Sequence, residues 1–272
     1  MPSVRTAPSV LLLVRACHPE PTVAVTALTV LLAVGAGATA GTTLLVTAAV
    51  FTGQLSIGWS NDLVDARRDK IVHRADKPVA TGALAESTVR VALVVAVAAC
   101  VVLSLLCGLR SGLTHLTLGV GSGWAYNLGL KRTRWSWLPY ALAFGSLPAV
   151  VSQALSPPHL PPLWLMAAGA LLGVGAHLVN ALPDLLDDEA TGVRGLPHLL
   201  GRRLSQRLAT AVLVVASAVA VLGPGTRPPV WCWTGLAAIV ALALLGLRSP
   251  GRLAFHVTVA IAVVDVVMLT AR

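Results

Sequence analysis

The chain has 272 residues, of which 56% are hydrophobic and only 11% are charged, compared with roughly 25% charged residues in ordinary soluble domains. This composition excludes a typical soluble domain and favours one helical bundle in a lipid bilayer. The net charge of +9 does not indicate nucleic-acid binding, because the basic residues are dispersed in short connections between apolar runs. The four cysteines form no C-x-x-C pair, and we expect them to pack as small hydrophobic residues.

The apolar runs predict an all-α, polytopic membrane bundle of about nine transmembrane helices. A transmembrane helix requires about 20 residues, and each run is close to this length. Glycine and proline clusters mark the breaks between runs. Residues 1–21 are predicted to be a cytoplasmic N-terminal segment, and residues 22–272 the transmembrane domain. The predicted spans are 22–38, 42–60, 87–106, 112–130, 135–154, 163–182, 206–223, 230–247 and 253–271.

The basic residues set the predicted orientation. If the spans alternate in direction, all but three of the 20 Lys and Arg residues fall on one side; the exceptions are Arg110, Arg227 and Arg272. Because positive residues are enriched in cytoplasmic loops, we predict a multi-pass cell-membrane protein with a cytoplasmic N-terminus.

Nine of the 11 acidic residues fall in two segments on that cytoplasmic side. Each segment follows a predicted span, and both have the spacing N-x-x-x-D-x-x-x-D. If helix continues through them, steps of four residues place all three polar groups on one face. The residues are Asn61, Asp65 and Asp69 in the first segment, and Asn180, Asp184 and Asp188 in the second.

Crowded carboxylates at a membrane boundary require a compensating cation. Mg²⁺ fits best, because it prefers oxygen ligands and is held by one or two carboxylates while substrate phosphates complete its shell. Basic residues follow both segments, and such residues neutralise the diphosphate oxygens that a metal does not reach. Arg74 and Lys77 follow the first segment, and Arg194 follows the second.

These residues resemble the UbiA superfamily of intramembrane prenyltransferases. The stretch from Asn61 to Asp69, followed by Arg74, Lys77-Pro78 and Gly82, is similar to the first aspartate motif of that family. The stretch from Asn180 to Gly201 resembles its second motif. Tyr126 with Lys131-Arg132 resembles its tyrosine-and-lysine element, although the spacing leaves Lys131 and Arg132 unranked.

The resemblance implies a nine-helix bundle in which two aspartate motifs hold Mg²⁺ around an isoprenyl diphosphate. The second motif departs from the family pattern, because Ala181 replaces an acidic residue, and Asp187 is an extra candidate. We therefore predict Asp65, Asp69, Asp184 and Asp188 as catalytic metal ligands. The further predicted ligands are Asn61, Asn180, Asp62 and Asp187, and the predicted substrate contacts are Arg74, Lys77, Tyr126, Lys131, Arg132 and Arg194.

The predicted reaction is Mg²⁺-assisted departure of diphosphate, followed by transfer of the isoprenyl group to an acceptor, which we expect to be aromatic. A membrane terpene cyclase that uses the same ionisation is the nearest alternative. An ion-coupled transporter is a weaker alternative, because its acidic residues would lie near the membrane midplane rather than at helix ends. His177 lies on the same helical side as Asn180, so it is a candidate for either packing or proton transfer.

Overall fold

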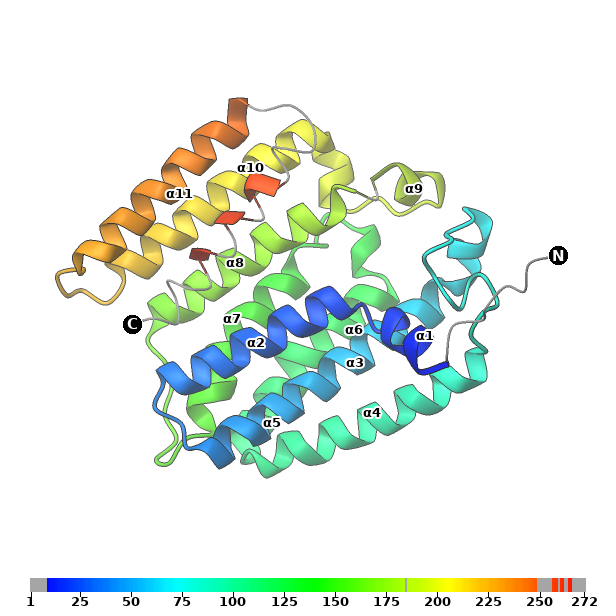
Figure 1. Cartoon of the computed structure of the whole chain (residues 1–272), viewed down its shortest axis with the longest axis horizontal. Coiled ribbons are helices and arrows are strands. Elements are labelled where there is room, and N and C mark those ends of the chain that lie inside the picture. Colours follow the sequence, from blue (N-terminus) through cyan, green and yellow to red (C-terminus); the bar gives the residue numbers. More distant parts are fainter. Residues whose placement is uncertain (1–8, 184, 249–255, 259, 262–263, 266–272) are drawn as a thin grey trace.

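The computed structural model describes residues 9–183, 185–248, 256–258, 260–261 and 264–265 of the chain. The regular structure of this described part is helical, and Figure 1 shows its helices packed side by side in one bundle. In chain order they are α1 (Ser9–Ala16), α2 (Pro19–Gly35), α3 (Ala40–Ile71), α4 (Glu86–Leu106), α5 (Leu109–Thr114), the π-helix η1 (His115–Val120), α6 (Gly121–Leu128), the 3₁₀ turn η2 (Leu130–Arg132), α7 (Leu138–Gln153), α8 (Leu163–Ala181), α9 (Leu185–Ala190), α10 (Leu196–Leu222) and α11 (Val230–Arg248).

The first eight predicted spans each overlap helical segments, and the fourth corresponds to the continuous run of α5, η1 and α6. The ninth, 253–271, lies mostly outside the described residues. Within the described part, five helices are long and apolar enough to cross a membrane: α3, α4, α8, α10 and α11. The pair α1 and α2, which is bent by 69°, makes a sixth if it forms one span. The structure therefore supports a multi-pass bundle, and the total of nine spans stays a prediction.

Helix α3 is much longer than its predicted span, which ended at residue 60. It begins after the capping residue Thr39, whose side chain accepts a hydrogen bond from the Thr42 amide, and it ends at Ile71. Its 32 residues rise about 48 Å, whereas the hydrocarbon core of a bilayer is about 30 Å thick. The helix consequently extends beyond the hydrocarbon, and the first acidic motif occupies its C-terminal turns.

The second acidic motif does not lie on one continuous helix, so the predicted ladder of side chains is wrong for this segment. Helix α8 ends at Ala181, and the short helix α9 begins at Leu185. Pro183 stands between them. A proline has no backbone N–H and its ring clashes with the preceding turn, so it separates Asn180 from the acidic residues that follow.

Glycines of α8 allow this helix to pack directly against the backbone of α7. A Cβ atom added to Gly173 of α8 would lie 2.4 Å from the carbonyl oxygen of Tyr140 on α7. One added to Gly169 would lie 2.7 Å from the carbonyl oxygen of Phe144. Only glycine permits this backbone approach, which is the packing that membrane helices use in place of large apolar side chains.

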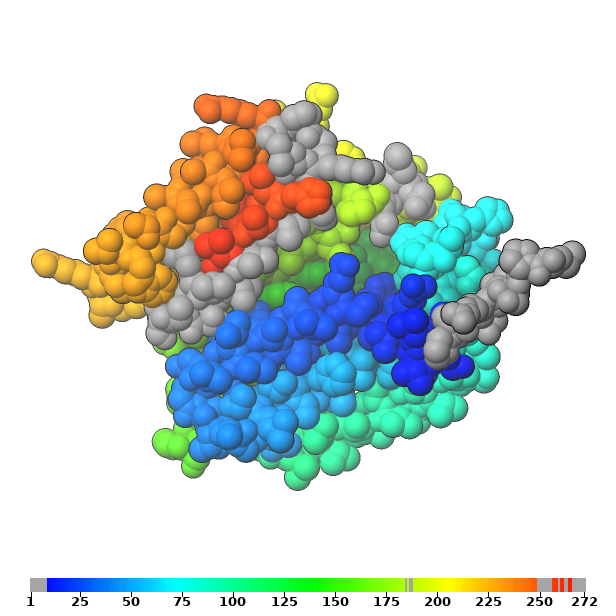
Figure 2. All heavy atoms as spheres, in the orientation of Figure 1, coloured from blue at the N-terminus to red at the C-terminus, as the bar shows by residue number. Residues whose placement is uncertain are grey.

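The helices divide into two sides of the molecule. Figure 1 shows α2, α3 and α4 along one side and α8, α10 and α11 along the other. The C-terminal end of α3, the bend between α1 and α2, and α9 all lie at the same end of the bundle. Figure 2 shows a hollow between α2 and the C-terminal helices, with mid-chain residues visible at its floor. This arrangement brings the two acidic segments to one end of the protein.

Candidate functional site

Three carboxylates of α3 are buried together at that end of the bundle. Asp62, Asp65 and Asp69 are each at most 3% exposed. Their spacing of three and four residues places them on one side of the helix. Burial of three acids so close to one another requires positive charge nearby, and each of them faces basic side chains.

Asp65 has the densest set of contacts. The ammonium Nζ of Lys131 donates hydrogen bonds of 2.6 and 2.5 Å to its two carboxylate oxygens. Arg68 and Asn61 each donate a hydrogen bond of 3.1 Å to Oδ2. Burial lowers the pKa of the Lys131 ammonium, and the Asp65 carboxylate opposes that shift. Lys131 is therefore buried against an acidic side chain, whereas Arg132 is exposed.

Arg68 connects the two acidic motifs. Its guanidinium lies 3.1 Å from Asp65, 3.6 Å from Asp69 and 3.7 Å from the Oδ1 atom of Asp188 in α9. Asp188 also lies 3.8 Å from His198. The predicted approach of the two acidic segments is thus present for Asp188. Arg68 was not among the predicted site residues, although its position one turn after Asp65 is a usable sequence signal.

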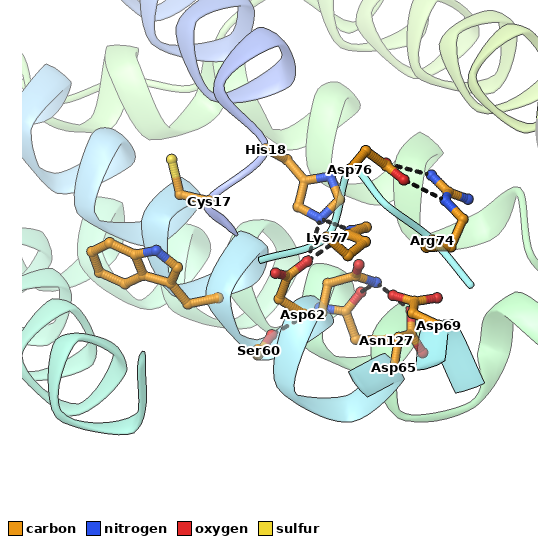
Figure 3. Close-up of polar contacts among 12 residues, drawn as sticks. Cys17, His18, Ser60, Asp62, Asp65, Asp69, Arg74, Asp76, Lys77 and Asn127 are labelled. Carbon is orange, nitrogen blue, oxygen red and sulfur yellow. Dashed lines mark hydrogen bonds and ion pairs between the residues drawn. The ribbon is translucent and has the colours of Figure 1, made fainter. Parts of the chain in front are cut away.

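Asp62 is contacted by residues from two other segments, as Figure 3 shows. The ammonium of Lys77 donates a hydrogen bond of 2.7 Å to its Oδ1 atom. Lys77 is also 2.8 Å from the Nε2 atom of His18. The Oδ2 atom of Asp62 is buried and has no hydrogen-bond partner. His18 was not predicted, because a single histidine after Cys17 has no ligand spacing.

Two of the remaining predicted basic residues pair with other acidic residues. Arg74 pairs with Asp76, with two hydrogen bonds of 2.9 Å, and Figure 3 shows this pair beside the cluster. The hydrogen bonds from Arg74 lower the pKa of Asp76 to about 2. Arg194 is exposed and lies 3.8 Å from Glu189.

Tyr126 lies in an aromatic cluster between α6, α7 and α8. Its ring meets those of Tyr140 and His177 edge to face, with centroids 5.3 and 5.8 Å apart. Asn180 is exposed and donates a hydrogen bond of 3.3 Å to the Tyr140 hydroxyl. His177 is buried, and its Nε2 atom lies 3.0 Å from the hydroxyl of Ser136. Asn180, which was predicted to lie on one helix face with Asp188, thus contacts the aromatic cluster.

Two predicted ligands fall outside the described side chains. Asp184 lies outside the described residues, and nothing is described of the side chain of Asp187. In the described part of the chain, no three Asp, Glu, His or Cys side chains are grouped so that they alone could hold a metal ion. Even so, the donors suit Mg²⁺, since they are buried carboxylate oxygens and Oδ2 of Asp62 has no partner. This ion takes one or two carboxylates and completes its shell with water and phosphate oxygens.

An apolar cavity of about 240 Å³ lies beside the same helix α3. Ser56 is the α3 residue that lines it, nine residues before Asp65 and thus about 14 Å away along the helix axis. Trp124 of α6 donates a hydrogen bond of 3.3 Å to the Ser56 hydroxyl. The other lining residues are Val97, Cys100, Val101, Leu116, Val120 and Gly121. Nine residues make two and a half helical turns, so Ser56 and Asp65 lie on opposite sides of α3, and the apolar cavity is separate from the charged helix end.

Comparison with curated proteins gives related sequences over part of the chain. It is 30% identical over 177 residues to the bacteriochlorophyll synthase 33 kDa chain of Cereibacter sphaeroides, a match that covers 62% of this chain and 56% of that protein. It is 27% identical over 121 residues to the protein of the same name from Rhodobacter capsulatus, with 40% of each chain covered. The chain thus spans about half the length, or less, of these relatives.

Solved structures show the same fold over nearly the whole chain. A UbiA homologue from Archaeoglobus fulgidus bound to GPP and Mg²⁺ matches with a TM-score of 0.68 and 15% identity, covering 96% of this chain and 98% of that one. A digeranylgeranylglyceryl phosphate synthase matches with a TM-score of 0.72 and 16% identity, covering 97% and 98%. A UbiA homologue from Aeropyrum pernix K1 matches with a TM-score of 0.70 and 19% identity, covering 90% and 97%.

The model of the UbiA prenyltransferase family matches residues 22–254. This range includes both acidic motifs, the basic residues that contact them, and nearly every described helix. The chain therefore belongs to the UbiA prenyltransferase family.

Proposed function

We propose that the protein transfers an isoprenyl group from an isoprenyl diphosphate to an acceptor, with Mg²⁺ held at the acidic end of α3. One observation carries the proposal most strongly. Arg68 contacts Asp65 and Asp69 of the first motif and Asp188 of the second. Carboxylates from both motifs and cationic side chains are thus gathered where a metal-bound diphosphate would need them.

The proposed metal ligands are oxygens of the first motif together with Asp188, and Asp184 and Asp187 stay candidates. When bound, Mg²⁺ supplies positive charge that lowers the cost of the charge developing on the departing diphosphate. The chain supplies further positive charge through Arg68, Lys77 and Lys131. All three now contact carboxylates, so they are already held beside the position proposed for the phosphates.

Positive charge placed in advance is effective because it requires no reorganisation during the reaction. Lys131 is buried and has hydrogen bonds to both oxygens of Asp65, so its ammonium has little freedom. We propose that Lys131, rather than Arg132, contacts the diphosphate. Arg74 and Arg194 stay proposed contacts, although each pairs with an acidic neighbour in this structure.

The cavity between α3, α4, η1 and α6 suits the hydrocarbon part of the substrate. Most of its lining residues are apolar. Ser56, its residue in α3, precedes Asp62, Asp65 and Asp69 by about 9, 14 and 20 Å along the helix axis. An apolar chain bound there would be removed from water, and this burial would contribute to substrate affinity. Tyr126 belongs to α6, which also lines the cavity, and its ring contacts Tyr140; it is a proposed substrate contact.

The acceptor in this proposal is aromatic. The names of the curated relatives support a biosynthetic enzyme instead of an ion-coupled transporter. We further propose that the protein lies in the cell membrane with its N-terminus and both acidic motifs on the cytoplasmic side, which the distribution of basic residues supports.

Purified protein tests this function directly. It should be incubated with Mg²⁺ and isoprenyl diphosphates of increasing length, with and without aromatic acids, and the products identified by mass spectrometry. We expect diphosphate release and a prenylated acceptor. A cyclic hydrocarbon formed without an acceptor would instead identify a terpene cyclase, and no consumption of any isoprenyl diphosphate would refute both activities.

A further inference from the structure

His18 has a backbone conformation that few residues other than glycine adopt. It lies at the bend between α1 and α2 with φ 56° and ψ 73°, in the left-handed region. A Cβ atom makes this region unfavourable, and glycine is the residue that enters it at no steric cost. The contacts of the His18 side chain with Lys77 and Asp62 can offset this strain.

The bend is fixed against α3 by backbone contacts. A Cβ atom added to Gly58 of α3 would lie 2.1 Å from the carbonyl oxygen of Cys17, so the two backbones touch. The indole of Trp59 donates a hydrogen bond of 3.0 Å to the carbonyl oxygen of Leu13. Asp62 follows Gly58 by one helical turn and faces the same side. The docking of the bend therefore places His18 beside Asp62.

The His18 ring contacts the ammonium of Lys77, as Figure 3 shows. The distance from Lys77 Nζ to His18 Nε2 is 2.8 Å, and the distance to Asp62 Oδ1 is 2.7 Å. An ammonium has only donors, so Nε2 of His18 accepts this hydrogen bond and the ring proton is on Nδ1. Lys77 is thus held by one charged acceptor and one neutral acceptor.

We propose that His18 is a positioning residue for Lys77, an inference that rests on the proposed prenyl transfer. The neutral ring holds the ammonium over the acidic end of α3. Oδ2 of Asp62 is buried without a partner, so this carboxylate has an oxygen available to an ion. When an ion binds Asp62, His18 holds Lys77 beside the diphosphate and does not neutralise the charge of the Lys77 ammonium.

Binding of inorganic diphosphate in the presence of Mg²⁺, measured by calorimetry, tests this role without any turnover. His18→Gly removes the ring and relieves the backbone strain, so the fold should be at least as stable as the wild type. We expect roughly tenfold weaker diphosphate binding, the size of effect expected when a hydrogen bond to a charged group is lost. The KM for isoprenyl diphosphate should rise by a similar factor, with a smaller change in kcat.

Two further variants separate positioning from packing. His18→Gln provides an amide oxygen that can accept from Lys77, so it should recover part of the lost affinity. His18→Gly combined with Lys77→Met should bind diphosphate no more weakly than Lys77→Met alone, because His18 acts through Lys77. Additive losses in the double variant, or unchanged binding in His18→Gly, would overturn the proposal.

The wild type separates this inference from the function on which it rests. If wild-type protein binds no diphosphate with Mg²⁺, the proposed function fails and His18 has nothing to position. If the wild type binds it and His18→Gly binds equally well, only the positioning role fails.

Discussion

The first acidic motif lies on one unbroken helix, whereas the second is divided between the end of α8, a proline and the short helix α9. In α3 the carboxylates are buried and contacted by Lys131, Lys77 and Arg68. Asp188 of the second motif is less buried and lies 3.7 Å from Arg68. The two motifs have equal spacing in sequence, but the first lies on one continuous helix and the second is interrupted between two helices. We propose that α3 holds the charged groups in place and that the second motif completes the site around them.

The largest expected effect is that of Asp65→Asn. This change removes the partner of Lys131 and Arg68, and we expect about a thousandfold lower rate of diphosphate release, equivalent to about 4 kcal/mol of lost transition-state stabilisation. A buried charge left without its partner also destabilises the fold by about 3–5 kcal/mol. Thermal unfolding in detergent and diphosphate release measure the two effects separately.

The double variant Asp65→Asn with Lys131→Met serves as the control for folding. Removal of both charges should recover much of the stability while the activity stays low. Glu86→Gln changes an exposed acidic residue of α4 and should leave both measurements unchanged. Wild-type activity in Asp65→Asn would contradict the assignment of the α3 carboxylates.

Asp188→Asn tests the second motif by the same measurements. Its separation from Arg68 is longer and the side chain is partly exposed, so we expect less than about 1 kcal/mol of lost stability. We expect about a hundredfold loss of activity, since the proposed metal loses one charged ligand. If Asp188→Asn lowers stability as much as Asp65→Asn does, the proposed division between the two motifs is wrong.

Pro183→Ala tests the break between α8 and α9. The change permits α8 to continue past Ala181 and would rotate the following acidic residues away from Arg68. We expect a loss of activity of about tenfold, with little change in thermal stability, because the proline lies at a helix end. Pro162→Ala, at the other end of the same helix, is the matched control. Equal activity in both variants would show that the break after α8 has no functional importance.

The smallest effect is expected for Asp76→Asn, which removes the exposed partner of Arg74. The ion pair should contribute well under about 1 kcal/mol, because the carboxylate is largely in solvent. Arg74 holds the pKa of Asp76 at about 2, below its usual 3.8. The carboxylate therefore stabilises the fold above pH 3.8, and this contribution is lost as the pH falls through about 2. Unfolding of the wild type and the variant should differ slightly at neutral pH and converge in acid, whereas a difference that grew in acid would contradict this assignment.

Hydrophobic periodicity predicted most of the helices, because the lengths and flanking glycines and prolines of the runs reflect packing in lipid. The run that ended at residue 60 did not reveal that α3 continues, since a helix outside the hydrocarbon no longer needs apolar residues. Side chains after a helix end were harder to place. The spacing of Tyr126 left Lys131 and Arg132 unranked, and the 3₁₀ turn that begins after Gly129 decides which of the two is buried. His18 and Arg68 were missed because their contacts depend on tertiary packing.

The continuous helix α3 fixes the distance between the cavity and the charged end of the helix. Ser56 at the cavity and Asp65 at the charged end belong to one rigid element, about 14 Å apart along the axis. In the proposed binding mode, a substrate whose phosphate end lies at Asp65 has to reach across that interval, and half a turn around the helix, before its hydrocarbon tail enters the cavity. The length of isoprenyl chain that the protein accepts can therefore depend on the distance between Asp65 and the cavity as well as on the volume of the cavity.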